Sequence, residues 1–512
     1  MLDCTRFLLM QGLSSRGHDE SKESLNKGNL IGLLNWYATR RKKINEVLFS
    51  NAPGNDQMTS PSIHNDLVNC CAVETTRSMI YEIGDSLFSI LVDESCDNSI
   101  KEQMVVVLRF VDKSGQVKEH LLGICHIADT CAQSLKDAIN ATFSTHGLSI
   151  SSLRGQGYDG TSNMSGEFNG LKALILRENP CAMYIHFFAH QLQLAVVSMA
   201  HRNVMLSDLF NMLAIIVNLR LNIEELFGGT SRFQEMSLAR PDDLSQALQK
   251  KDQNIQNAMR LLKLCKCTLQ NMRDNGWDTL LSKVIQFCVD RHISVPNMDD
   301  IVVSKGRPRR ASQQVTYYHC FYVDLFCYVI DSILQELNDR FPETTTELFT
   351  CISCLSPRDS FAAFDVCKLV RLAQLYPIDF NSEELLLIRP QLDKFLMLVR
   401  MDEAFFNLKS ISCVAQKLVE TGSSCYFPWV YRLITLVLIL PVATASVERV
   451  FSAMNLIKND LRNKMGEELL NDNLVVYMER DLFMKLENET ILQRFQNIRP
   501  RRIQLSKLTI SE

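Results

Sequence analysis

The stretch from residue 87 to residue 188 constrains the fold more than any other part of this sequence. Five apolar runs of strand length lie in it, and a polar turn at 112–115 separates the second run from the third. Helical spacing of apolar residues follows the third, fourth and fifth runs. The predicted strands are Leu87–Val92, Met104–Val111, Val117–Ile127, Leu153–Tyr158 and Ala182–Phe188. The pattern therefore predicts the order β-β-β-α-β-α-β-α.

Three antiparallel strands followed by βα units form the order of ribonuclease H-like domains, which belong to the α/β class and have a mixed sheet. From residue 203 to residue 421 the sequence shows helical periodicity and no convincing strand. Clear hydrophobic patterns reappear after this region, in the apolar run Trp429–Ala445 and in the long amphipathic stretch Ser446–Met484. We therefore predict a mixed sheet, then a large all-helical region, then a C-terminal helical region.

Two aspartates stand at the ends of predicted strands. Asp93 follows the first strand and Asp159 follows the fourth. Because these strands are neighbours in a ribonuclease H-like sheet, the two carboxylates would converge and bind a divalent metal through oxygen. Two metals held in this way can activate water and stabilise the leaving oxygen in phosphodiester cleavage. Each aspartate taken alone is better explained as a cap of a turn, whereas the strand order favours metal binding for the pair.

Glu448 offers the third carboxylate that such a site needs. It lies in Ala445–Ser452, where an apolar run ends and a helix begins. A first-turn glutamate that is stabilised by the helix dipole explains the same residue. The residue pattern alone leaves both interpretations open.

Longer strings in the sequence resemble hAT superfamily transposases. Thr444–Asn463 resembles the C-terminal dimerisation region of that superfamily. Other strings resemble its plant zinc-finger-MYM-like branch, whose members carry a TTF-type zinc finger. They are Arg6–Gly12, Arg16–Ser21, Gly155–Gly166, Ala189–Leu194 and Val295–Arg310. The resemblance covers nearly the whole chain.

The resemblance implies a ribonuclease H-like core split by a helical insertion, with Asp93, Asp159 and Glu448 as catalytic and metal-binding residues. It implies Mg²⁺ (or Mn²⁺) as cofactor if the chain is catalytically active. It also singles out His190, in the motif after the fifth strand, and Arg449, beside Glu448. The expected partner is a second copy of the chain or a related hAT-type chain.

The resemblance also suggests how the chain is divided. We expect an N-terminal helical segment and linker at 1–62, the first part of the core at 63–202 and the helical insertion at 203–421. The dimerisation region at 422–487 would complete the core, and a basic tail would follow at 488–512.

Three departures from the family pattern weigh against active transposition. No Cys-x-x-Cys pair or His cluster precedes Cys70, so we expect the zinc finger itself to be absent. Phe187 stands where the family has a cysteine. An Arg-Trp pair, which supports a DNA end in the family, is missing after Ala239–Asp243.

The charge of the chain limits how it can contact DNA. Its 54 Lys and Arg against 58 Asp and Glu give a net charge of −4, which excludes a uniformly basic coat. DNA contact is therefore expected only from local basic patches at 40–43, 305–310 and 499–502. Arg307 and Arg309 belong to the second patch, which resembles an AT-hook core and also a nuclear localisation signal. A solvated basic loop explains that patch best.

The sequence favours neither a membrane span nor a zinc site. The apolar run Leu433–Ala445 is interrupted by Pro441 and is shorter than the roughly 20 residues that a membrane span needs. Cys351 and Cys354 form a lone pair without a second pair at zinc-finger spacing, so no zinc site is predicted. We expect a nuclear protein, with the cytoplasm as the alternative.

Three hypotheses follow. The first is a domesticated transposase-derived protein that acts through dimerisation and DNA binding. The second is an active hAT transposase that cuts DNA by a two-metal DDE mechanism. The third is a relic of a transposon.

Overall fold

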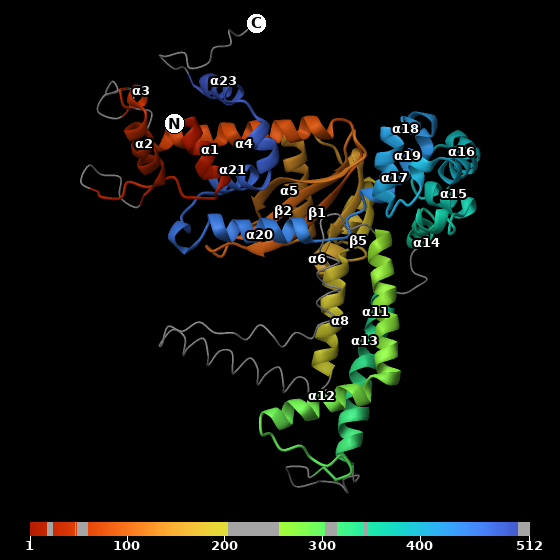
Figure 1. Ribbon diagram of the computed structural model, residues 1–512. Coiled ribbons are helices and arrows are strands. Elements are labelled where there is room, and N and C mark those ends of the chain that lie inside the picture. Colours follow the sequence, from red (N-terminus) through yellow and green to blue (C-terminus); the bar gives the residue numbers. More distant parts are fainter. Residues whose placement is uncertain are drawn as a thin grey trace. The chain divides into compact units, whose positions relative to one another are not determined.

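The computed structural model describes residues 1–17, 24–46, 48, 60–202, 255–302, 315–341 and 347–499. Packing separates the chain into two compact units (Figure 1). The first unit consists of Met1–His186 together with Leu355–Glu512, and the second of Phe187–Cys354. Arg307 and Arg309 lie outside the described residues, as does the end of the basic tail.

A five-stranded mixed sheet forms the centre of the first unit, in the order β3-β2-β1-β4-β5. β1 is antiparallel to β2 and parallel to β4, and β4 is parallel to β5. The strands are β1 (Phe88–Cys96), β2 (Glu102–Val111), β3 (Val117–His126), β4 (Leu153–Tyr158) and β5 (Met183–His186). The predicted α/β class, the mixed sheet and the position of the first strand between the second and the fourth are confirmed.

The predicted hairpin joins β2 to β3. Every residue of β2 after Glu102 is buried, as a β-branched run covered on both faces should be. In the turn, Oδ1 of Asp112 accepts hydrogen bonds from the backbone N–H groups of Ser114 and Gln116, both at 2.9 Å. Gly115 has a φ of 79°, a left-handed conformation that glycine adopts without steric cost.

β1 is longer than the sequence predicted. The prediction ended it at Val92, but antiparallel pairing with β2 continues as far as Cys96, opposite Glu102. Pairing with β4 stops earlier, at Leu91 opposite Gly157. The prediction that the strand ends before Asp93 is therefore wrong on the β2 side, because β2 supplies partners for residues that β4 does not.

Helices of the first unit surround this sheet in two groups along the chain. The first group is α1 (Leu2–Met10), α2 (Asn29–Arg40), α3 (Lys42–Asn45), α4 (Pro61–Ile83), α5 (Ala132–Thr145), α6 (Ser162–Ser165) and α7 (Leu171–Glu178). The second is α15 (Val366–Gln374), α16 (Ser382–Met401), α17 (Ile411–Glu420), α18 (Ser423–Tyr426), α19 (Pro428–Leu438), α20 (Ala445–Ile457), α21 (Glu467–Met478), α22 (Arg480–Lys485) and α23 (Asn488–Ile498). No helix in the described part of the chain is long and apolar enough to cross a membrane.

The apolar run Trp429–Ala445 is covered within the chain, as expected. It forms most of α19 and the extended segment after it, and α19 contacts α16, α17 and β2. The amphipathic stretch Ser446–Met484 forms α20, α21 and most of α22 rather than one long helix. α20 packs against β1 and β2, and α21 packs against the edge strand β3 and against α4.

The second unit is helical. Its helices are α8 (Phe188–Arg202), α11 (Ile255–Asn275), α12 (Trp277–Asp290), the π-helix η3 (His319–Cys327), α13 (Tyr328–Arg340) and α14 (Glu347–Ser353). α13 packs beside both α8 and α11 (Figure 1). Among the described residues of this unit the only β-structure is an isolated bridge between Ile301 and Thr316. The predicted helical character therefore holds for the described residues between 203 and 421.

The compact units meet between His186 and Phe187 and between Cys354 and Leu355, while the division of the chain into five segments stays a prediction. α8 joins the second unit because it packs on α13, and the chain from Leu355 onward joins the first. One link between this part of the chain and the sheet is a buried ion pair. Nε and Nη2 of Arg154, on β4, donate to the two carboxylate oxygens of Asp379 at 2.5 and 2.9 Å.

This pair leads to a test of the packing. Asp379→Ala should lower the free energy of unfolding by about 3–5 kcal/mol, because it leaves the Arg154 guanidinium buried without its partner. Replacing both residues, as Arg154→Met with Asp379→Leu, should cost much less. Urea denaturation followed by circular dichroism measures both. Equal losses in the single and double variants would contradict the role assigned to this pair.

Candidate functional site

The register of two parallel strands brings Asp93 and Asp159 to the same level of the sheet. Leu91 of β1 lies opposite Gly157 of β4. Two residues further along are Asp93, still within β1 and opposite Val105 of β2, and Asp159, directly after β4. Pairing of β1 with β4 ends before them, so the register directs both aspartates towards the carboxyl end of β4 without pairing them.

Asp159 also caps the turn that follows β4. Its Oδ1 accepts hydrogen bonds from Oγ1 of Thr161 at 2.8 Å and from the N–H of Thr161 at 3.3 Å. Its carbonyl oxygen accepts a hydrogen bond from the Tyr184 hydroxyl at 3.0 Å. The turn-cap interpretation of this aspartate is therefore correct, and it leaves the second carboxylate oxygen available for another role.

Glu448 lies in the first turn of α20, as expected from the sequence. Its Oε1 accepts a hydrogen bond of 2.6 Å from the Thr444 hydroxyl, and its side chain is exposed. Thr444 precedes the helix and is itself buried. α20 packs against β1 and β2, so the glutamate stands beside the strand that carries Asp93.

The three carboxylates, here called the acidic trio (Asp93, Asp159 and Glu448), are electrostatically coupled. Burial raises the pKa of Asp93 to about 6, although a hydrogen bond from the Glu94 N–H opposes that rise. Repulsion from Asp159 and from Glu448 raises this pKa further. Like charges disfavour the ionised form, so Asp159 and Glu448 both oppose the ionisation of Asp93.

Glu94 is a fourth acidic residue in this region, and sequence reasoning missed it. Burial raises its pKa to about 7, with repulsion from Asp159, Glu102 and Asp93 acting in the same direction. The signal in the sequence was the Asp-Glu pair at 93–94, where only the first residue was considered.

The donor chemistry of the acidic trio fits a hard divalent cation, since carboxylate oxygens are the ligands that Mg²⁺ and Mn²⁺ prefer. The three side chains of the acidic trio do not form a complete metal-binding cluster. Over the residues that the structure describes, no three His, Cys, Asp or Glu side chains are grouped to hold a metal ion.

A buried network fixes the start of α20, and with it Glu448. Arg109 of β2 donates from Nη1 to Oε1 of Glu119 on β3 at 2.5 Å, and from Nε to the carbonyl oxygen of Leu438 at 3.0 Å. The Ser446 hydroxyl, in the first turn of α20, donates to the other oxygen of Glu119. Arg109 and Glu119 are almost fully buried, so this network joins the helix to the sheet inside the core.

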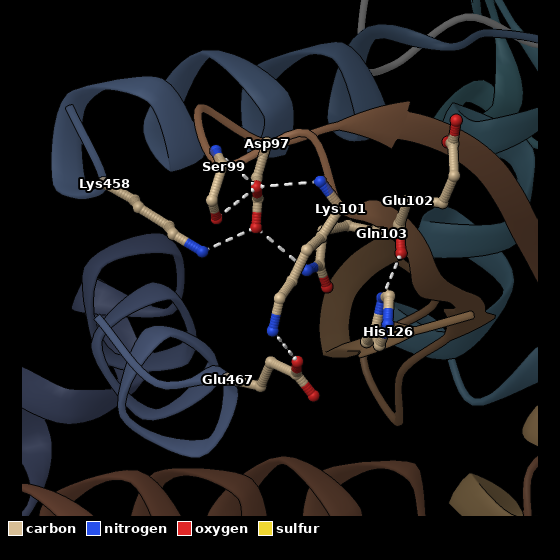
Figure 2. Close-up of polar contacts among 8 residues, drawn as sticks. All are labelled: Asp97, Ser99, Lys101, Glu102, Gln103, His126, Lys458 and Glu467. Carbon is tan, nitrogen blue, oxygen red and sulfur yellow. Dashed lines mark hydrogen bonds and ion pairs between the residues drawn. The ribbon is translucent and has the colours of Figure 1, made fainter. Parts of the chain in front are cut away.

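A second buried pair fixes the end of α20 (Figure 2). Nζ of Lys458 donates to Oδ2 of Asp97 at 2.6 Å, and both side chains are at most 1% exposed. Gln103 donates to the same oxygen, while Ser99 and the backbone N–H of Lys101 donate to Oδ1. Burial alone would raise the pKa of Asp97, but these hydrogen bonds and Lys458 hold it well below its usual value.

Sequence reasoning missed both networks, although it left one signal. Arg109 interrupts the apolar run of β2, and a charged residue in a fully buried strand requires a partner. The hairpin places Glu119 directly opposite Arg109. The contact of Glu119 with Ser446 could not be predicted, because these two residues are far apart in sequence.

The other residues that the sequence singled out are Arg449, His190 and the pair Cys351 and Cys354. Arg449 donates from Nη2 to the Ser446 hydroxyl at 2.9 Å and from Nε to the Ala445 carbonyl at 3.1 Å, so it belongs to the network at the start of α20. His190 lies in α8, in the other compact unit. Cys351 and Cys354 are both buried, and Sγ of Cys354 donates to the carbonyl oxygen of Thr350 at 3.5 Å.

Two regions of the chain match known families. Residues 1–170 match a family described as "ZMYM1/FAM200, RNase-like domain", and residues 416–482 match the "hAT family C-terminal dimerisation region". The chain therefore carries an RNase-like region and an hAT-type dimerisation region. Asp93 and Asp159 fall within the first match, and Glu448 falls within the second.

One human protein is also similar over part of the chain. It is the "52 kDa repressor of the inhibitor of the protein kinase", which is 26% identical over 179 residues. The match covers 34% of this chain and 23% of the human protein, so it spans less than a quarter of that relative.

The raised pKa of Asp93 predicts a pH-dependent stability. A carboxyl whose pKa is higher in the folded chain opposes folding above that pKa and ceases to do so as it is protonated. Asp93→Asn should therefore raise the free energy of unfolding at pH 8, by up to about 3 kcal/mol. The gain should shrink between about pH 6 and pH 4. Urea denaturation at several pH values measures it.

Asp85→Asn, at an exposed position outside the acidic trio, is the matched control and should show no such trend. A stability difference for Asp93→Asn that stays constant with pH would contradict the assignment.

Proposed function

We propose that this chain is a self-associating, hAT-derived nuclear protein that contacts DNA through local basic patches and uses its ribonuclease H-like core as a scaffold. The observation that carries the proposal is the way in which the dimerisation region and the core form one body. α20 and α21 of that region pack on three strands of the sheet. A buried hydrogen bond joins Ser446 of α20 to Glu119 of β3, and the buried Lys458–Asp97 ion pair joins the end of α20 to the β1–β2 turn. A partner that binds this region would therefore be held rigidly to the core.

The amphipathic stretch Ser446–Met484 begins with an apolar stripe at three- and four-residue spacing, formed by Val447, Val450, Phe451, Met454, Ile457 and Leu461. Of these residues, Val447, Val450, Met454 and Ile457 are buried in the chain itself. Phe451 is partly buried, and Leu461 is 96% exposed. Leu456, on the outer side of α20, is 51% exposed. A second copy would thus contact Leu456 and Leu461 rather than the whole stripe.

Light scattering tests this surface. The unmodified chain should have a dimeric mass at micromolar concentration, and the double variant Leu456→Lys, Leu461→Lys should be monomeric, because it places two cations in an apolar contact. The matched control is Leu386→Lys with Met397→Lys, at exposed positions of α16, which should leave the dimer intact. A strictly monomeric unmodified chain would overturn the proposed self-association.

The nuclear location rests on the family and on one relative. The name of the human relative describes a repressor, and transposase-type proteins act on DNA. A fluorescent fusion of the full chain that is excluded from nuclei would contradict this location.

Metal-dependent DNA cleavage is the second candidate function, and the electrostatic coupling of the acidic trio favours it. Asp93 and Asp159 would hold Mg²⁺ or Mn²⁺ from the sheet, and Glu448 would do so from α20. Such a metal supplies Lewis acidity and lowers the pKa of bound water. The protein's own contribution is to fix Glu448 beside the sheet through the Glu119 and Ser446 network.

A cleavage assay separates the two functions. We expect the isolated chain to show little or no site-specific cutting of transposon-end DNA with Mg²⁺ or Mn²⁺. Asp93→Ala, Asp159→Ala and Glu448→Ala serve as controls for contaminating nucleases. Metal-dependent cutting that each substitution abolishes would make the protein an active transposase and would replace the first proposal.

A further inference from the structure

Helix α2 has a buried face and an exposed face of very different chemistry. Leu30 and Leu34 are buried and pack with Cys4 and Leu8 of α1. The opposite face leaves Trp36 55% exposed, and nothing lies within 4 Å of the position that a side chain at Gly32 would occupy. One side of this helix is therefore fixed and the other is open.

Trp36 is an unusual residue to leave in water. The chain has only three tryptophans, and an indole ring carries one of the largest apolar surfaces of any side chain. The guanidinium of Arg40, one turn further along α2, lies over the ring at 5.3 Å from its centroid. This pair presents a flat aromatic surface with a cation at its edge.

The exposed face of α2 runs directly into a cluster of positive charge. Arg40, Arg41 and Lys42 are all exposed, and none of them forms an ion pair within the described part of the chain. Residues 24–45 contain no acidic residue, in a chain whose net charge is −4. The local field is therefore opposite in sign to that of the whole molecule.

We propose that Trp36, Arg40, Arg41 and Lys42, here called the α2 patch, form a binding site for single-stranded nucleic acid. The cations pair with phosphates, and a base stacks on the exposed face of Trp36. Aromatic rings combined with a basic surface are the recurring elements of single-strand binding sites, because every base has a π-face and every linkage has a charge. A duplex offers phosphates to the cations but no free base to the ring.

This inference rests on the proposed function, since it names the nucleic acid and the surface through which the protein would contact it. It is separate from self-association, which uses Leu456 and Leu461. It is also separate from the acidic trio. Failure of the α2 patch would leave the dimer proposal standing, and light scattering of the same samples distinguishes the two results.

Substitutions in the α2 patch should not disturb the packing of the core. α1, which supports α2, belongs to the core cluster through Leu2 and Leu9, together with residues of α4, α21 and α23. Trp36 and the three cations contribute nothing to that cluster. Their replacement should leave the fold unchanged, and the thermal unfolding midpoint checks this.

The experiment measures fluorescence anisotropy of a labelled oligothymidylate of about 12 nucleotides, a length within the usual site size, with the full chain. Trp36→Ala should weaken binding of the single strand about tenfold. It should leave binding to a duplex of equal length almost unchanged. Trp36→Phe should retain most of the affinity, because the ring is kept.

The cations are tested through salt. Arg41→Gln with Lys42→Gln should weaken binding and should reduce the slope of log affinity against log salt by about 1.4, since each single-strand phosphate contact contributes about 0.7. The matched controls are Tyr81→Ala, another exposed aromatic residue, and Lys368→Gln with Arg371→Gln on α15. Neither should change affinity or slope.

Several outcomes would overturn the proposal. The unmodified chain could fail to bind the oligonucleotide, Trp36→Ala could bind it as well as the unmodified chain does, or the control variants could lose as much affinity. Equal competition by polyglutamate or by vesicles of phosphatidylserine would assign the patch to an acidic protein or to a membrane surface instead.

Discussion

A buried lysine–aspartate pair determines where α20 lies on the sheet. Lys458 and Asp97 have lost nearly all contact with water, which costs several kcal/mol before their attraction is counted. Hydrogen bonds from Ser99, Lys101 and Gln103 complete the surroundings of the carboxylate. A helix shifted by one turn would leave a charge buried alone, so the pair selects one docking position more than it adds stability.

The docking position of α20 matters because the candidate site is divided between distant parts of the chain. Parallel register directs Asp93 and Asp159 towards the same end of the sheet, whereas Glu448 lies on a helix from the C-terminal part. Buried polar contacts hold both ends of that helix, through Ser446 at its start and Lys458 after its end. Without them, the third carboxylate would have no defined place beside the other two.

The surfaces proposed for binding use different elements. Self-association would use the outer side of α20 and the turn after it, which the sheet leaves uncovered. Nucleic acid would bind on α2, which is attached to the core through α1. Each surface stands on a helix whose other face is buried, so each can be changed without disturbing the packing beneath it. This separation makes the two proposals independently testable.

The sequence by itself determined the sheet and its strand order, because apolar runs of strand length and a hairpin turn are local signals. It also pointed to Asp93, Asp159 and Glu448, two of them from the strand order and the third from its resemblance to a known family. It could not determine where β1 ends, since that depends on how far β2 extends beside it.

Only the tertiary structure decided which distant charged residues pair. The partners of Arg154 and Lys458 come from distant parts of the chain, and no local pattern encodes such pairings. Tertiary packing also decided that most of the apolar stripe of α20 is buried in its own chain. Amphipathic spacing shows that a face must be covered, but what covers it depends on which surface the rest of the fold brings there.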